Sequence, residues 1–387
     1  MTDPEQLWPI RPGVTYLNHG SWGPTPWFVQ RERQKWSERL ASQPMDFFLR
    51  EHETALDAAR AKLAKFIGAK PHNLAFVDNA TFGMNVVAAN VRVGAGDEIL
   101  ATDHEYGAVL RLWRQTCQQT GATVRIARLP EQFTTAEVLI DTLFAQVTPQ
   151  TKLLVVSHIA SPTAVLFPVA AICQRAAKEG LNVCIDGAHA PAAVDIQLEK
   201  LNCDYYVASC HKWLCAPLGS GFLYVHPRRQ RAVEPRVVSW GNSLGGRPSN
   251  WVDEFHWAGT RDPASFLAVG AAVEFLEKAG VERFRQHSRD LIRYARQQIS
   301  SWTGLEPTVP AEGWTGTMIA LPLPEAVGPP LQPHSHQLQQ QLWHEHQIEV
   351  PIVNWHDKRW LRVSAHLYND SGDIDRLLLA LKKSVGT

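Results

Sequence analysis

Residues 181–226 constrain the fold more than any other stretch of this 387-residue chain. An apolar run ends at Asp186, a second run covers residues 205–208, and a third covers residues 219–225. Short apolar runs bounded by turn residues are typical of buried strands. In open α/β sheets, the carboxyl ends of the strands form the edge at which ligands bind. The sequence therefore predicts that Asp186 and Lys212 reach one ligand-binding edge.

An acid and a lysine at the same sheet edge have a joint chemical use. A partly desolvated lysine has a lowered pKa, so its free amine can attack a carbonyl carbon and form a Schiff base. A carboxylate beside a pyridine nitrogen keeps that nitrogen protonated, and the two features together are the signature of a pyridoxal phosphate enzyme. Taken singly, Asp186 also fits a turn at a strand end, and Lys212 fits a side chain that reaches solvent from a helix start.

The residues around these two positions resemble a known family. The sequences DGAHA at 186–190 and DYYVASCHKWLCAPLGSGFL at 204–223 are similar to those of the pyridoxal phosphate enzymes of aminotransferase class V, fold type I. Within that class they look most like the isopenicillin N epimerase-like branch, and the resemblance runs through nearly the whole chain. It implies pyridoxal 5′-phosphate as the cofactor, Lys212 as the Schiff-base lysine and Asp186 as the partner of the pyridine nitrogen.

The same resemblance implies further contacts with the cofactor. His189 is implied as a contact of the 3′-hydroxyl group, and Ser209 and His211 as ligands of the phosphate. Thr260 is implied to touch the phosphate of a neighbouring subunit, so we expect a homodimer with shared active sites. The remaining implied contacts are Tyr106 stacked on the ring, with His104 as the second choice, and His158 near the 3′-hydroxyl. A lone histidine at a strand end is also commonly a hydrogen-bonded structural residue.

The segment after the apolar run 73–77 fits a phosphate site. A polar turn, residues 78–83, separates that run from an apolar helical pattern over residues 84–89. Unpaired N–H groups and the dipole at a helix start bind anions. The turn matches neither the Walker sequence nor the GxGxxG fingerprint. By resemblance to the phosphate turn of class V enzymes, the N–H of Ala80 and the hydroxyl of Thr81 are implied as ligands.

Two segments are implied as contacts of the substrate. NHGSWGP at 18–24 resembles an opening segment of the epimerase-like branch that lies near the substrate, which makes Asn18 and His19 substrate-side candidates. A tight turn with a surface histidine fits the same residues. Arg362 lies in a predicted strand and is implied to hold the substrate α-carboxylate, a natural use of a bidentate guanidinium. An interdomain salt bridge is the alternative for Arg362.

Alternating strand and helix patterns predict an α/β architecture with a mostly parallel sheet, right-handed crossovers and helices on both faces. We expect this large cofactor-binding domain to span residues 15–265. Residues 280–387 indicate a smaller α+β domain, against which the segment 1–14 is expected to pack. The clearest predicted elements are helices over 27–42, 52–66 and 281–302, strands near 317–321 and 348–353, and a terminal helix from Asp373.

Composition excludes several classes of partner. With 38 Lys and Arg against 38 Asp and Glu, the chain has no net charge to attract nucleic acid or an anionic membrane. No apolar stretch reaches the roughly 20 residues that span a bilayer, and the start MTDPEQLWPIRPG is too polar for a secretory signal, so we expect a cytoplasmic protein. The six cysteines form no CxxC pair, which predicts reduced core thiols, and the C-terminal histidines match no metal spacing.

The sequence leaves the reaction open. Removal of the Cα proton of an amino acid can lead to epimerisation, to β-elimination by a C–S lyase, or to transamination. We expect one of the first two and keep an aminotransferase as the alternative. A cysteine desulfurase is disfavoured because residues 347–362 lack the cysteine that those enzymes carry before the arginine-bearing strand. Epimerisation also needs a second proton donor opposite Lys212, for which Tyr106, His104 and His19 are candidates.

Two interpretations from other classes fit the sequence less well. A non-catalytic binding relative would have lost Lys212 or Asp186, and both are present. A Rossmann-type dehydrogenase would carry a glycine fingerprint, which the chain lacks.

Overall fold

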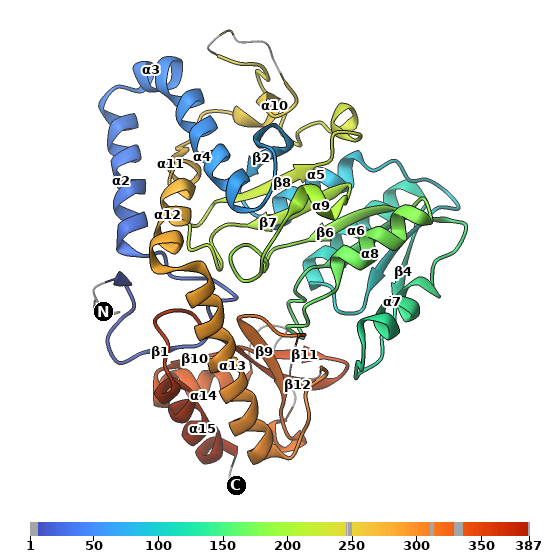
Figure 1. Ribbon diagram of the computed structural model, residues 1–387, viewed down its shortest axis with the longest axis vertical. Helices are drawn as coiled ribbons and strands as arrows, with labels where there is room; N and C mark the ends of the chain where they lie inside the picture. Colours follow the sequence, from blue (N-terminus) through green and yellow to red (C-terminus); the bar gives the residue numbers. More distant parts are fainter. Residues whose placement is uncertain (1–6, 245, 247–249, 310–312, 329–335, 386–387) are drawn as a thin grey trace.

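The chain folds around one large sheet (Figure 1). The computed structural model describes residues 7–244, 246, 250–309, 313–328 and 336–385. Among these residues, the large sheet has seven strands in the order β2-β8-β7-β6-β5-β3-β4. Their bounds are Leu74–Val77 (β2), Gly221–Val225 (β8), Tyr205–Ser209 (β7), Asn182–Asp186 (β6), Thr151–Ser157 (β5), Glu98–Thr102 (β3) and Thr123–Ala127 (β4).

Most strands of this sheet are parallel. Strands β7, β6, β5, β3 and β4 pair in parallel, whereas β8 is antiparallel to both of its neighbours, β7 and β2. β2 therefore runs in the same direction as β7. The carboxyl ends of every strand except β8 meet at one edge, which confirms the predicted sheet and places a ligand-binding edge where the sequence motifs fall.

Alternate residues of each strand enter two separate cores. Leu154 and Val156 of β5 belong to one core, and Leu153 and Val155 to the other. Helices that contribute to the first core include α4 (His52–Phe66), α7 (Ala136–Phe144), α8 (Val169–Lys178) and α12 (Val269–Ala279), and the second core is covered by α5 (Ala80–Asn90) and α6 (Gly107–Thr120). Both faces are thus buried, which is why the strands read as continuous apolar runs.

The N-terminal helices coincide with their predicted limits. α2 spans Trp27–Ser42 and is followed, after a short corner, by α4. The corner consists of α3 (Pro44–Asp46) and the π-helical turn η1 (Phe47–Glu51). The remaining short helical elements that the structure describes before residue 270 are η2 (Pro71–Asn73), α9 (Leu198–Leu201), η3 (Gln230–Ala232), α10 (Asp253–His256) and α11 (Ala264–Leu267).

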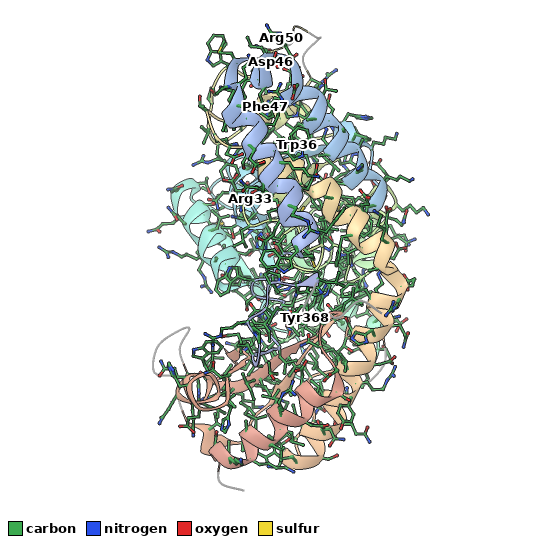
Figure 2. All side chains as sticks on the ribbon, turned by 90° about the vertical axis from the view of Figure 1, so that its left-hand side faces the viewer. Arg33, Trp36, Asp46, Phe47, Arg50 and Tyr368 are labelled. Atoms are coloured by element: carbon green, nitrogen blue, oxygen red, sulfur yellow. The ribbon has the colours of Figure 1, made fainter. Side chains whose placement is uncertain are left out.

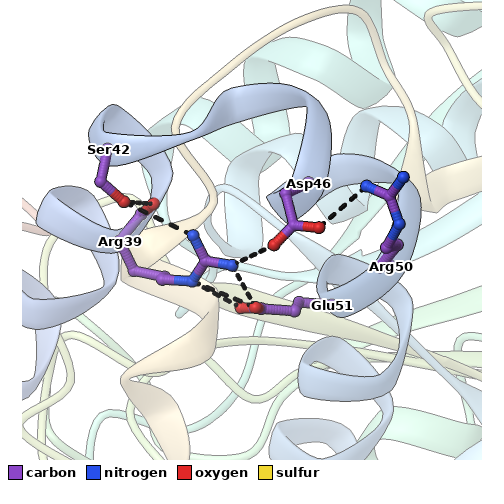
Figure 3. A network of polar contacts seen from close by, with 5 residues as sticks. All are labelled: Arg39, Ser42, Asp46, Arg50 and Glu51. Atoms are coloured by element: carbon purple, nitrogen blue, oxygen red, sulfur yellow. Dashed lines mark hydrogen bonds and ion pairs between the residues drawn. The ribbon is translucent and has the colours of Figure 1, made fainter.

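A network of charges closes the corner between α2 and α4 (Figure 3). Arg39 donates to the carboxylates of Asp46 and Glu51, and Asp46 also accepts from Arg50 at 2.8 Å. Figure 2 shows this corner at the end of α2 that is remote from Tyr368. Arg50 is therefore engaged in a surface ion pair.

The C-terminal part of the chain is α+β, as predicted. A three-stranded antiparallel sheet has the order β11-β12-β9 within the described residues. It packs with the long helix α13 and with α14 and α15 around a third core (Figure 1). The bounds are Val281–Thr303 (α13), Met318–Pro322 (β9), Glu325–Val327 (η4), Gln337–His346 (α14), Ile352–Trp355 (β11), Lys358–Ser364 (β12) and Ser371–Val385 (α15).

The N-terminal segment joins this part of the fold. β1 (Thr15–Tyr16) pairs in parallel with β10 (Ile348–Glu349), and Asn18 bridges to Ser364. Residues 15–18 therefore lie against C-terminal elements, although the sequence predicts that the large domain starts at residue 15. The limits of the two domains stay predictions.

Two predicted elements differ from the observed ones for local reasons. The strand expected over 348–353 is two strands, β10 and β11, separated around Pro351, whose lack of an N–H interrupts pairing. Helix α5 begins at Ala80, before its apolar pattern starts, because Asn79 caps it by accepting from the Phe82 N–H at 2.9 Å. The proline-rich stretch 322–336 also predicts a loop, of which residues 329–335 lie outside the described residues.

Two expectations drawn from the composition concern the cysteines and the presence of membrane-spanning helices. All six cysteines are buried and free, which confirms the predicted core position of these side chains. Of the helices that the structure describes, none combines the length and the apolar character needed to cross a membrane.

Candidate active site

The carboxyl ends of the parallel strands carry most of the residues that the sequence singles out. Asp186 is the last residue of β6, His158 follows β5, Ser209 ends β7 just before His211 and Lys212, Ala80 and Thr81 begin α5 after β2, and Tyr106 precedes α6 beyond β3. The fold thus gathers side chains from five strand ends that are far apart in the sequence.

Lys212 contacts His189 at this edge. Its Nζ lies 3.0 Å from Nε2 of His189. Burial, followed by the positive charge of Arg362, lowers the pKa of Lys212 from 10.5 to about 7, and the Asp186 carboxylate opposes this shift. A substantial fraction of the amine is therefore uncharged near neutral pH, and the uncharged amine is the form that attacks a carbonyl carbon.

His189 is a buried, neutral ring. Burial and then the charge of Lys212 hold its pKa well below the usual value. Nδ1 has no hydrogen-bond partner among the described residues. In the tautomer in which Nε2 accepts from Lys212, that Nδ1 carries a proton, so it is a donor available to a bound ligand.

Asp186 is a buried carboxyl group whose charge acts on Lys212 without direct contact. Burial raises its pKa, although the N–H of Ala188, 3.0 Å from Oδ1, and the charge of Lys212 both favour the charged form. The residue after it has to be glycine, because a Cβ on Gly187 would lie 2.0 Å from the ring of Tyr206. A buried carboxylate with so few partners is suited to a cationic partner in a bound ligand.

His158 has hydrogen bonds that a structural residue would make. Its N–H donates to the carbonyl oxygen of Asp186 at 2.8 Å, and its Nδ1 lies 2.8 Å from the Tyr206 hydroxyl. Burial lowers the pKa of the ring to about 4. The predicted contact with the 3′-hydroxyl stays a prediction.

Ser209 and the start of α5 form one corner of the edge. The N–H of Ala80 donates to Oγ of Ser209 at 3.1 Å, and the side chain of Thr81 is exposed. Burial, with Lys212 adding to it, lowers the pKa of His211 to about 4, and its Nδ1 is unpartnered in the part of the chain that is described. The corner combines a helix start, two hydroxyl groups and a ring nitrogen, a set that suits a phosphate.

Tyr106 stands at the N-terminal end of α6 with 45% of its surface exposed. The preceding residue, Glu105, is buried and accepts from the Thr102 hydroxyl at 2.7 Å and from the N–H and hydroxyl of Ser157 at 3.1 and 2.6 Å. Glu105 thereby ties the loop of Tyr106 to the end of β5. His104, the second choice for stacking, is fully buried and lies 2.7 Å from the Thr163 hydroxyl.

Arg362 on β12 approaches the same edge from the C-terminal part of the chain. One Nη donates to the carbonyl oxygen and hydroxyl of Ser161 at 2.8 and 3.1 Å, and the other to the Ser21 hydroxyl at 2.7 Å. Nε lacks a partner within the described residues. Burial lowers the pKa of Arg362 to about 10, and the nearby Tyr106 opposes that shift. Its partners are neutral oxygens, so its charge remains available to an anion.

The two N-terminal candidates are buried. Asn18 donates to a carboxylate oxygen of Glu349 at 3.3 Å, and its own Oδ1 has no partner within the described residues. His19 is fully buried, with Nε2 3.1 Å from the carbonyl oxygen of Lys212, so the interpretation as a surface histidine is wrong. Thr260, in contrast, is exposed.

Three residues of this region escaped the sequence analysis. Glu105 sits beside Tyr106 in the printed sequence, but its burial is a tertiary property. Ser21 lies inside the NHGSWGP segment, and Ser161 two residues before Thr163 in a loop after β5. All three lie in or beside segments that contain predicted site residues, and this was the signal that the sequence offered. The contacts of Ser21 and Ser161 with Arg362 depend on the fold.

Comparison with known proteins decides the family. Residues 28–377 match the family model described as aminotransferase class-V. The chain belongs to the class-V aminotransferase family. The isopenicillin N epimerase of Amycolatopsis lactamdurans is 38% identical to it over 97% of this chain and 96% of the relative, and that of Streptomyces clavuligerus is 34% identical over the same shares. A probable cysteine desulfurase of Halalkalibacterium halodurans is 28% identical over 85% of this chain and 82% of its own.

Solved structures agree on the fold of this class-V enzyme. A C-DES variant with glycine covalently linked to its PLP cofactor superposes with a TM-score of 0.82 at 22% identity, covering 98% of this chain and 99% of the other. The cysteine desulfurase CsdA of Escherichia coli gives a TM-score of 0.79 at 21% identity, covering 100% and 99%. The predicted fold type I architecture is thereby confirmed.

The cofactor of this class-V enzyme is pyridoxal 5′-phosphate. The residues at the sheet edge fit that group. Lys212 offers an amine that is substantially uncharged, Asp186 a buried carboxyl group, and His189 and His211 buried ring nitrogens without partners among the described residues. The helix start at Ala80 supplies a place for an anion.

Proposed function

We propose that this class-V enzyme inverts the configuration at Cα of an amino acid, as an epimerase or racemase similar to isopenicillin N epimerase. The observation that carries this proposal is the position of Lys212. The pKa of Lys212 is about 7, and the charges of the buried Asp186 carboxyl group and of the buried Arg362 both act on it. Arg362 has no acidic partner among the described residues, so the site combines a base with a carboxylate-binding group. The 38% identity to an isopenicillin N epimerase over nearly the whole chain supports the choice of epimerisation.

The cofactor is assigned to the residues at the strand ends. When bound, pyridoxal phosphate supplies an electron sink that weakens the bond between Cα and its proton. Lys212 is the residue that bonds to the cofactor, Asp186 holds the pyridine nitrogen protonated, and Tyr106 covers the ring. The remaining assignments are His189 and His158 at the 3′-hydroxyl, and Ala80, Thr81, Ser209 and His211 at the phosphate.

Arg362 and Asn18 are assigned to the substrate. The guanidinium of Arg362 has a free Nε and neutral oxygen partners, which suits a bidentate contact with an α-carboxylate. The unpartnered Oδ1 of Asn18 is an acceptor suited to a donor group of the substrate.

Lys212 takes the Cα proton on one face of the substrate. Its lowered pKa lets the amine act both as base and, once protonated, as acid near neutral pH. Inversion also requires a proton donor on the other face. Tyr106 is the strongest choice, because its side chain is partly exposed and lies near enough to Arg362 to affect the pKa of that guanidinium.

C–S bond lysis is the second candidate. It is favoured by the structural likeness to the cystine C–S lyase C-DES, with a TM-score of 0.81 at 21% identity. In a lyase, Lys212 would remove the same proton, and no donor on the opposite face would be needed. Replacing Tyr106 therefore distinguishes epimerisation from C–S lysis.

A homodimer is also part of the proposal. Thr260 is exposed, as a residue that reaches a neighbouring subunit must be in a single chain. Two large apolar side chains, Val238 and Trp240, are 79% and 78% exposed and would gain burial in a dimer. Light scattering on the purified protein tests this, and a monomer with full activity would contradict it.

Proton NMR in heavy water tests the reaction. The protein loaded with pyridoxal phosphate is incubated with a panel of amino acids, cysteine conjugates and sulfoxides. Deuterium at Cα together with the inverted configuration supports epimerisation, and Tyr106→Phe should then retain exchange while losing inversion. A keto acid and ammonia formed without an added keto acid would replace epimerisation by lysis. Products that require an added keto acid would indicate transamination.

A further inference from the structure

A compact cluster of aromatic and thiol side chains packs against the backbone at Lys212 and Trp213. His19, Cys215 and His366 are completely buried, and one ligand atom from each lies within 4.8 Å of the others. They come from three distant segments of the chain. Figure 2 shows the neighbouring Tyr368 between the large sheet region and the C-terminal elements.

We propose that His19 and His366 are positioning residues that hold two consecutive carbonyl groups of the lysine loop. Nε2 of His19 lies 3.1 Å from the carbonyl oxygen of Lys212, and Nε2 of His366 lies 3.4 Å from that of Trp213. Because a carbonyl oxygen only accepts hydrogen bonds, the rings hold these carbonyls in the tautomer in which Nε2 carries the proton. Sγ of Cys215 lies 3.6 and 3.3 Å from Nε2 of His19 and of His366, and it donates to the Trp213 carbonyl at 3.5 Å. The N–H of Cys215 also donates to the Lys212 carbonyl, at 2.8 Å.

The other ring nitrogens agree with this tautomer. Nδ1 of His19 lies 2.9 Å from the Tyr368 hydroxyl, and Nδ1 of His366 accepts from the N–H of Leu367 at 2.8 Å. Each ring is therefore neutral, with Nε2 as donor and Nδ1 as acceptor. Burial lowers the pKa of His19 to about 3, so it stays neutral at physiological pH.

Packing fixes the two rings. Their centroids are 4.2 Å apart with planes 21° from parallel, and Trp213 stacks on His19 at 5.2 Å. A Cβ on Gly23 would lie 2.3 Å from Nε2 of His19, so only glycine fits there. This explains why the NHGSWGP segment needs that glycine.

The same geometry argues against a metal ion in the cluster. A metal lies close to the plane of each imidazole that binds it, and two nearly parallel stacked rings cannot both meet that condition at one point. Each Nε2 also lies within hydrogen-bond distance of a carbonyl oxygen, to which the N–H of a neutral ring can donate. We therefore assign the cluster to hydrogen bonding.

These contacts connect Lys212 with Arg362. His19 touches the Lys212 carbonyl, and Ser21, two residues later, accepts from Arg362 at 2.7 Å. Arg362 lies on β12, and His366 lies just after the C-terminal end of that strand. The histidine pair thus sets the lysine relative to the arginine, and its role in turnover rests on the proposed function. His19 then acts through the Lys212 backbone instead of on the substrate.

The test compares His19→Phe with His19→Gln. Phenylalanine keeps a ring in the stack but cannot donate to the Lys212 carbonyl, whereas the glutamine amide can. His52→Phe is the matched control, because His52 is also a buried histidine (4% exposed) but contacts Phe47, Phe48 and Trp257. Cofactor-free full-length protein is mixed with pyridoxal phosphate across a pH series, and the rate of visible absorbance gain is recorded.

We expect the pH midpoint of cofactor uptake in His19→Phe to move by about half a pH unit or more, because the lysine amine shifts in its pocket. His19→Gln should restore most of the wild-type midpoint, and His52→Phe should keep it even where its Tm falls. Turnover of His19→Phe should drop by about 100-fold, since a displacement of about 1 Å has that effect.

An unchanged midpoint in His19→Phe would overturn the proposal, whatever its Tm, because a purely structural histidine affects stability alone. Stoichiometric zinc in the purified protein that is lost with His19→Phe would also overturn it. Uptake involves no amino acid, so these results hold whether the enzyme proves to be an epimerase or a lyase.

Discussion

Nζ of Lys212 lies 3.0 Å from Nε2 of His189, so the direct neighbour of the reactive amine is a neutral ring and not the carboxylate of Asp186. The arrangement separates two tasks. His189 holds the amine without adding charge, and Asp186 acts on the lysine only through space. A direct ion pair would instead keep the lysine protonated and unreactive.

Cofactor uptake should follow the protonation of Lys212. With a pKa of about 7, the uncharged fraction of the amine rises about tenfold between pH 6 and pH 8. The rate at which cofactor-free protein gains visible absorbance should rise by a similar factor and level off above pH 8. Lys212→Arg is the control and should show no such gain. A rate that keeps climbing towards pH 10.5 would mean that the lysine pKa is not lowered.

Asp186→Asn should keep the fold and lose catalysis. The amide oxygen can still accept from the Ala188 N–H, and removing a buried negative charge relieves its desolvation. Without the carboxylate, the electron-withdrawing power of the cofactor falls, and we expect turnover to drop by about 10²- to 10³-fold. Steady-state kinetics of the cofactor-loaded variant measure this, with Asp195→Asn as a surface control. A loss of less than tenfold would assign the pyridine nitrogen to another residue.

Arg362→Lys should weaken substrate binding more than it slows the reaction. Lysine keeps the charge but not the forked donors, so one charged hydrogen bond to the carboxylate is lost, which raises KM by about 10- to 100-fold. Arg359→Lys is the matched control on the same strand, because Arg359 donates to the carbonyl oxygens of Gly328 and Asp357 instead. If KM stays at the wild-type value while kcat falls, Arg362 does not bind the ground-state substrate.

Glu105→Gln should change how stability depends on pH. Burial raises the pKa of Glu105 from 4.5 to about 7, with Asp186 adding to the shift against the hydrogen bonds from Ser157 and Thr102. A raised folded-state pKa contributes stability that is complete below about pH 4.5 and lost as pH rises through about 7. Glutamine carries no charge, so the Tm of Glu105→Gln relative to the wild type should increase between pH 5 and pH 8.

Glu105→Ala provides the contrast to the glutamine variant. It leaves the Ser157 N–H and two hydroxyl groups without their acceptor, which we expect to destabilise the fold by about 2–4 kcal/mol. Thermal unfolding followed by circular dichroism measures both variants. A Tm difference between Glu105→Gln and wild type that is constant with pH would show that Glu105 titrates normally.

Local patterns in the sequence were sufficient for much of the fold. The limits of α2 and α4 follow from apolar periodicity, and the buried strands follow from short apolar runs between turn residues. Where the prediction missed, a local signal was overlooked, as with the Asn79 cap of α5 and the break at Pro351.

The burial and the contacts of the candidate site residues could not be predicted from local sequence patterns. Histidine at position 19 is compatible with a turn, a substrate contact or a core, and only the packing of Trp213 and His366 around it decides which. Burial and hydrogen-bond partners are sums over neighbours that are distant in sequence, and a linear pattern carries no information about them.

By itself, the sequence determined the family and the cofactor, and it predicted the roles of Lys212 and Asp186, because these depend on a contiguous motif at strand ends. Only the tertiary structure decided that His19 contacts the backbone carbonyl of Lys212 and that Ser21 accepts a hydrogen bond from Arg362, 341 positions away. The physical reason is that a motif records which groups are present, whereas their separation, burial and charge state depend on how the folded chain brings its segments together.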